Sequence, residues 1–144
     1  MSHARQTIRA EWIALVEQLD QMPAEGVFDS LEGMKAAVES QIPAAGVWIQ
    51  SDIPDEYTEG GEGERIIDRS LTIRIVMVSD DLDQLEGYNA DVERRALATT
   101  HVEIEGPETQ MLHSVRGDRP LFASVLDYDL RYQTKEGAPD VIYQ

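Results

Sequence analysis

Apolar positions recur along the chain with either helical or strand spacing. Within residues 4–22 they fall every three or four residues, which places them on one stripe of a helix. Proline at position 23 ends this segment, because the residue before a proline avoids the helical conformation. We therefore predict an amphipathic helix whose buried stripe consists of Ile8, Trp12, Leu15, Val16 and Leu19.

The stretch RIIDRSLTIRIVMVSDDLDQL, residues 65–85, joins a strand pattern to a helix pattern. Leu71, Ile73, Ile75 and Met77 alternate with polar residues at first, which indicates a half-buried antiparallel strand. The last part is apolar at every position, so we expect cover on both faces there. Asp81 and Gln84 form a capping-box type of pair, and the helix after them continues through Leu85, Tyr88, Val92, Ala96 and Thr99.

A second long strand is predicted near the C-terminus. Successive residues alternate between its two faces. One face carries Phe122, Ser124, Leu126, Tyr128, Leu130 and Tyr132, and the other carries Asp127, Asp129, Arg131 and Gln133. Weaker patterns predict strands at 26–30 and 45–50 and a marginal helix at 31–42. We also expect a short strand at 101–105, a turn at Gly106-Pro107, and either a second short strand or an irregular segment at 111–115.

This order of elements indicates one α+β domain over residues 1–144. We expect a mostly antiparallel, mixed sheet of about four to five strands, with two main helices packed on one face. The polar flank of the last strand predicts that the other face meets water or another subunit.

Two segments are predicted to lie outside the regular elements. Residues 51–64, SDIPDEYTEGGEGE, contain one proline, three glycines, six acids and no base, so we predict a mobile acidic loop at about 51–65. Mobility is expected for residues 52–64, and nuclear magnetic resonance relaxation that shows their backbone to be as rigid as the flanking strands would contradict it. The carboxylate spacing in this loop does not fit an EF-hand. The end of the chain, about 135–144, is expected to be loosely held.

The charge balance changes which partners are plausible. Asp and Glu number 28 against 12 Lys and Arg, which gives a formal net charge of −16. Gripping a phosphate backbone needs clustered basic residues, so we expect no sequence-specific nucleic-acid binding. The charge is consistent with solubility, with a surface that repels nucleic acid, or with one that meets a basic partner.

Compartment and membrane signals are few. No run of 18 apolar residues occurs, and the N-terminus lacks the apolar core of a secretory signal, so we expect no membrane association. The chain has no cysteine, which excludes a disulfide framework and thiolate catalysis.

The sequence contains no recognisable catalytic, cofactor or metal motif. Its histidines, at 3, 101 and 113, lack a two-ligand helical spacing, and no serine lies in G-x-S-x-G. The glycines at 60, 61 and 63 match neither of the common phosphate-binding patterns. We expect no enzyme, no cofactor and no metal site, with an acid-based hydrolase as a distant alternative. Function is then expected to be carried by surfaces.

Three segments, RSLTIRIVMV at 69–78, the stretch 80–97 that begins DDLDQL, and LDYDLRYQT at 126–134, give the chain a recognisable order. With the N-terminal helix and the acidic loop, they resemble the tail terminator proteins of long-tailed phages, the minor tail protein U family. The resemblance covers roughly residues 4–134 and rests on pattern and order, not on an invariant motif. The acidic, glycine-rich loop and the helical pattern of 31–42 depart from the family.

The resemblance implies a structural protein that caps the tail tube, ends its polymerisation and forms part of the head–tail joining surface. Its implied partners are further copies of itself in a hexameric ring, the tail tube protein and the head-completion protein. It would be found in the virion tail, and in the host cytoplasm during assembly. A head–tail completion protein, or a small acidic adaptor that binds a basic protein, remain alternatives. The candidate subunit or tail contact residues are those of the loop: Asp52, Asp55, Glu56, Tyr57, Glu59, Glu62, Glu64 and Arg65.

Overall fold

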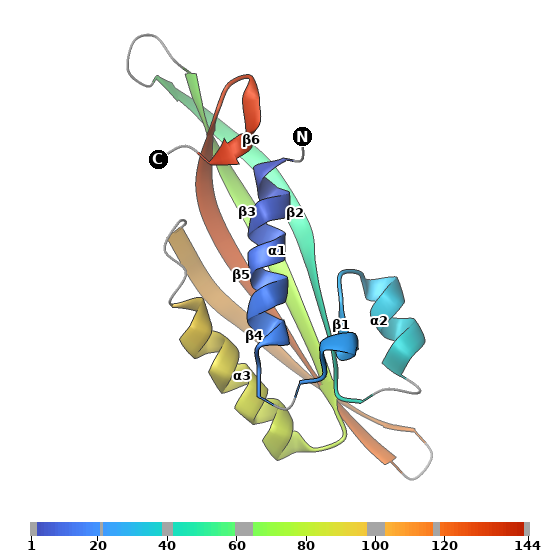
Figure 1. Cartoon of the computed structure of the whole chain (residues 1–144). Helices are drawn as coiled ribbons and strands as arrows, with labels where there is room; N and C mark the ends of the chain where they lie inside the picture. The colour runs from blue at the N-terminus through green and yellow to red at the C-terminus, as the bar shows by residue number, and fades with distance from the viewer. Residues whose placement is uncertain are drawn as a thin grey trace.

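Figure 1 shows a computed structural model in which long strands form one curved layer, and α1 and α3 lie side by side across it. The structure describes residues 3–20, 22–38, 42–59, 65–97, 103–116 and 119–142. The elements run in the order α1 (Ala4–Glu17), η1 (Ala24–Gly26), β1 (Val27–Phe28), α2 (Leu31–Val38), β2 (Ala44–Glu59), β3 (Arg65–Ser79), α3 (Leu82–Ala96), β4 (Glu103–Arg116), β5 (Arg119–Lys135) and β6 (Ala138–Ile142).

The sheet has the order β1-β2-β3-β5-β4, and β6 pairs with β5 beside this path. Every pairing is antiparallel except that of β1 with β2. The predicted α+β class and mixed, mostly antiparallel sheet are confirmed, although six strands form instead of four to five. The β2–β3 and β4–β5 hairpins extend toward opposite ends of the layer (Figure 1).

The main core lies between one face of the sheet and the two helices α1 and α3. The alternating apolar residues of β3 and β5 face it, as their spacing predicts, and the whole predicted stripe of residues 4–22 contributes to it. α1 ends at Glu17, earlier than predicted, so Leu19 lies in the segment after the helix. At its centre the rings of Trp12 and Tyr128 lie 4.8 Å apart between centroids, inclined by 46°. Both side chains are about fully buried, so aromatic packing holds α1 against the middle of the sheet.

A smaller apolar cluster covers the end of the opposite face. It contains Met34 of α2, Val76 and Val78 of β3, and Leu121 of β5, with Trp48 packed against them. Cover on both sides of the apolar end of β3 is therefore confirmed. Of the described helices, α1 and α3 share the main core. α2 packs in the second cluster and corresponds to the marginal helix predicted at 31–42, of which Leu31–Val38 is described as helical.

The predicted loop at 51–65 was wrong in its first half, because β2 continues to Glu59 in register with β3. Two irregularities in the β2 register, after Ile49 and after Pro54, accommodate the polar residues that resemble a loop in the sequence. The first one changes which face each residue occupies. It places Asp52 opposite Leu71, on the face that α1 covers.

The Gly106-Pro107 turn was also wrong, because this dipeptide lies in an irregularity inside the single long strand β4. Gly106 has φ 115°, and a Cβ built there would lie 2.9 Å from the carbonyl oxygen of Asp127. Glycine therefore allows β4 to stay paired with β5 on both sides of the irregularity.

The prediction that residues 135–144 are loosely held was wrong as far as Ile142, because β6 pairs with β5. Gly137, with φ 84°, turns the chain so that β6 pairs with β5. The Glu136 N–H also donates a hydrogen bond to the carbonyl oxygen of Arg65 at 2.8 Å.

Two glycine-to-alanine substitutions are expected to change stability in opposite directions. Gly106→Ala should lower the free energy of unfolding by about 1–3 kcal/mol, since it combines a strained φ with a backbone clash. Gly87→Ala, inside α3 with no atom within 4 Å of the added Cβ, should raise it by about 0.5–1 kcal/mol. Urea unfolding of both variants checks this. A Gly106→Ala protein as stable as the parent would show that the irregularity in β4 does not require glycine at position 106.

Candidate functional site

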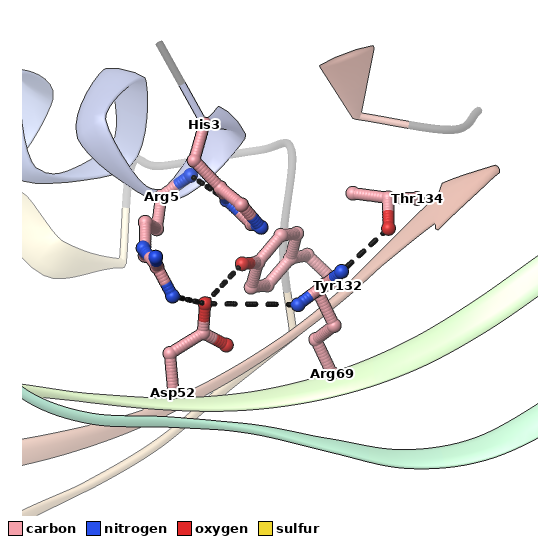
Figure 2. A network of polar contacts seen from close by, with 6 residues as sticks. All are labelled: His3, Arg5, Asp52, Arg69, Tyr132 and Thr134. Atoms are coloured by element: carbon pink, nitrogen blue, oxygen red, sulfur yellow. Dashed lines mark hydrogen bonds and ion pairs between the residues drawn. The ribbon is translucent and has the colours of Figure 1, made fainter. Parts of the chain in front are cut away.

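The most organised polar cluster lies at the N-terminal end of α1 and centres on Asp52 (Figure 2). One carboxylate oxygen, Oδ2, accepts hydrogen bonds from Arg5 Nη1 at 3.0 Å and from the Tyr132 hydroxyl at 2.9 Å. Arg69 Nη1 lies 3.9 Å from the same oxygen, and its Nε donates to Thr134 Oγ1 at 2.9 Å. The cluster thus connects α1 with β2, β3 and β5. We call it the Asp52 clamp, defined as Arg5, Asp52, Arg69, Tyr132 and Thr134.

The Asp52 clamp is buried unevenly. The side chain of Asp52 is 2% exposed and that of Arg69 is 11% exposed, whereas Arg5 is 39% exposed. A buried carboxylate is costly to desolvate unless cations and hydrogen-bond donors surround it, which is what Arg5, Arg69 and Tyr132 provide. Asp52 Oδ1 is also buried and accepts no hydrogen bond from the described residues.

The clamp is arranged for attachment rather than for proton transfer. Burial, and then the neighbouring Asp52 carboxylate, raise the pKa of the Tyr132 hydroxyl, so this group stays a hydrogen-bond donor at neutral pH. Because Asp52 Oδ2 already accepts from two donors, the oxygen is committed to holding α1 on the sheet. Its chemistry supports a structural role.

His3 caps α1 beside the Asp52 clamp. Its Nδ1 accepts a hydrogen bond from the Arg5 backbone N–H at 3.1 Å, which requires an unprotonated Nδ1. Burial lowers the pKa of His3, and the charges of Arg5 and Arg69 lower it further. The folded protein therefore disfavours the protonated imidazole more than the unfolded chain does.

The contribution of His3 to stability is expected to depend on pH. Since the folded pKa of His3 lies below the ordinary 6.5, the stabilisation is fully present above pH 6.5. It is lost as the pH falls from 6.5 through the folded pKa. His3→Ala should cost about 1 kcal/mol at about pH 7.5, and this difference from the parent should shrink toward about pH 5.5. Parallel urea titrations of both proteins measure the difference. A gap that is independent of pH would rule out the neutral cap.

The open face of the sheet carries exposed and half-buried polar side chains. Arg74 of β3 donates from Nε and Nη2 to the two carboxylate oxygens of Asp127, at 2.8 and 2.9 Å. Beside this pair, Thr72 donates to Asp129 at 2.7 Å, and the Gln133 amide donates to Asp68. These pairs cross from β3 to β5, so the predicted polar face of β5 forms a cross-strand ladder.

The predicted contact residues that the structure describes lie at different places in the fold. Asp52 lies in the clamp, where burial removes it from any external contact. Asp55, Glu56, Tyr57 and Glu59 lie in the outer part of β2. Arg65 begins β3, and its Nε lies 3.3 Å from Glu136 Oε2.

Glu62 and Glu64, the two remaining predicted contact residues, lie outside the described residues. The mobility expected for 52–64 stays a prediction.

Sequence reasoning missed the partners of Asp52. Arg5, Arg69 and Tyr132 come from three elements that are far apart in the chain, so no local spacing connects them. The available signal was weak: Tyr132 ends the apolar face of β5 with a hydroxyl group that needs a partner when buried.

Within the described residues, no group of three or more His, Cys, Asp or Glu side chains is arranged to hold a metal ion. None of the helices described is long and apolar enough to cross a membrane. Comparison of the chain with protein-family models and with curated proteins gave no match.

Proposed function

We propose that the chain is a structural phage tail protein that caps the tail tube, ends its polymerisation and forms part of the head–tail joining surface. The proposal rests on the resemblance of its strand and helix patterns to tail terminator proteins, together with a sheet whose two faces differ. No enzymatic activity is part of the proposed role.

The observation that carries the proposal is the open face of the sheet. α1 and α3 cover one face, whereas the apolar cluster around Met34 covers only the end of the other. Over the remainder, residues such as Arg74, Asp127 and Asp129 form a polar ladder that is half-exposed or exposed. A closed ring needs two different, complementary surfaces on each subunit, and a helical face and a stranded face meet that need.

The proposed assembly is a ring, expected to be a hexamer, that binds the tail tube protein on one side and the head-completion protein on the other. Its excess negative charge would keep passing DNA from adhering to the ring. In this proposal the protein is located in the virion tail, and in the host cytoplasm before assembly.

Native mass spectrometry of the protein, alone at rising concentration and then with a phage tail tube protein, tests the proposal. We expect a closed ring, formed by concentration or by the tube protein. Arg74→Glu, which reverses a charge in the open face, should reduce ring formation, while Arg74→Lys, which keeps the charge, should reduce it less. A strict monomer under every condition would overturn the proposal.

A small acidic adaptor that binds a basic protein is the second candidate. It is favoured by the exposed glutamates Glu103, Glu105 and Glu108 of β4, two of which lie opposite aspartates of β5, and it requires no self-association. A monomer that binds a basic protein and does not affect tube growth would support it instead.

A further inference from the structure

β4 is the last strand on its side of the sheet. It pairs with β5 from Glu103 to Arg116, and no other described strand pairs with its second edge. The irregularity at Gly106-Pro107 divides this edge, so an extended segment can add through backbone N–H and C=O groups along the regular stretch from Glu108 to Arg116, with its end beside Glu103 and Glu105. The edge is therefore a surface on which a peptide could be bound by main-chain hydrogen bonds.

One end of the β4 edge is strongly negative. Glu103, Glu105 and Glu108 are exposed and lie on the open face of the sheet. The register places Glu105 opposite Asp129 and Glu108 opposite Asp127. Like charges directly opposite each other on neighbouring strands are destabilising, so a cation beside them would be favourable.

The cations on this part of the sheet do not balance the acids. Arg74 of β3 already donates to both carboxylate oxygens of Asp127. On β5, Arg131 lies opposite Glu103. A strand added outside β4 would place every second side chain next to the glutamates. Basic side chains at those positions would be complementary to the edge.

The other end of the β4 edge is apolar. Met111 is 42% exposed and Leu112 is 49% exposed, and they project to opposite faces of the same strand. An added strand would therefore meet apolar surface on both of its faces at this end. One exposed apolar side chain on each face gives an added strand an apolar contact above and below the sheet.

We propose that the β4 edge binds an extended basic segment of a different protein, which adds to the sheet as a further strand. Its Lys or Arg side chains lie beside Glu103, Glu105 and Glu108, and its apolar side chains lie beside Met111 and Leu112. The inference does not depend on the tail role, because a ring subunit and an adaptor would both present this edge.

A second copy of the chain is a poor occupant of this edge. The other long strand with an unpaired stretch is β2, whose outer part reads SDIPDEYTE and contains no base. Pairing β4 with the outer part of β2, or with another β4 in parallel, would bring acid against acid, which costs free energy. Antiparallel pairing of two β4 edges over their full length would set Glu105 and Glu108 opposite Ser114 and Met111, which offer these glutamates no cation, whereas a basic segment supplies one.

The probe is a fluorescently labelled peptide in which lysine alternates with threonine at one end and consecutive valines form the other. We expect saturable binding to the full chain, with slower amide hydrogen exchange in β4 and unchanged exchange in β2. Two versions, each N-methylated at alternate amides in one of the two phases, should differ, because only one phase loses the donors that face β4.

Three triple variants locate the binding surface. Glu103→Lys, Glu105→Lys and Glu108→Lys together should weaken binding about tenfold or more, and the corresponding Gln triple should weaken it less. Glu17→Lys, Glu25→Lys and Glu86→Lys change the net charge equally at exposed positions elsewhere, and should leave affinity within about twofold. Equal weakening in both Lys triples, protection outside β4, or no saturable binding would overturn the proposal.

Discussion

Asp52→Ala will lower the free energy of unfolding by about 3–5 kcal/mol, the size expected when one partner of a buried ion pair is removed. The substitution leaves Arg69, which is 11% exposed, without its carboxylate, and the buried Tyr132 hydroxyl without an acceptor. Arg5 can turn toward water, so its share of the loss is small. Urea unfolding monitored by circular dichroism measures the change.

Asp129→Ala is the matched control, because this aspartate is exposed on the open face of the sheet and accepts a hydrogen bond from the Thr72 hydroxyl. Its cost should stay below about 1 kcal/mol. Asp52→Asn should fall between the two, since the amide oxygen still accepts from Tyr132 but carries no charge for the arginines. If Asp52→Ala and Asp129→Ala cost the same, the Asp52 clamp does not hold α1 on the sheet.

Trp12→Ala will cost about 3–5 kcal/mol of unfolding free energy, the range for removing a large aromatic side chain from a core. Trp12 is 1% exposed and packs at the centre of the sheet face against Tyr128, so its removal leaves a cavity under α1. The melting temperature should fall accordingly. Circular dichroism is the suitable probe, because it does not depend on the tryptophan that is removed.

Leu97→Ala controls for loss of apolar area without loss of packing. Leu97 is 86% exposed just after α3, and its replacement should change the stability by no more than about 0.5 kcal/mol. A Trp12→Ala protein that unfolds at the parent's urea concentration would mean that α1 is not held by its buried stripe.

The elements with regular spacing could be predicted from the sequence. The stripe of α1, the alternation of β3 and β5, and the Asp81 cap of α3 are local patterns, and each has the predicted structure. Asp81 accepts from the N–H groups of Asp83 and Gln84, while the Gln84 side chain accepts from the Ser79 hydroxyl instead of closing the predicted box directly. Local chemistry thus determined where these elements begin and which face they bury.

The parts that could not be predicted depend on register. The alternation along β2 breaks after Ile49, so an acidic and proline-containing stretch resembles a loop although strand pairing continues. The same break turns Asp52 inward, toward partners from α1 and β5. A glycine at position 106 similarly signals a turn in the sequence but allows an irregularity within β4. In each case tertiary pairing overrides local propensity.

We propose that this protein acts through its surfaces, by capping a tail tube. Polymerising a phage tail tube protein with and without this chain, and measuring tube lengths by electron microscopy, tests that role itself. A terminator should shorten the tubes in proportion to its concentration and be bound at one tube end, and a chain carrying Arg74→Glu should have no effect. Tubes of unchanged length, with the protein absent from their ends, would show that the chain does not cap them.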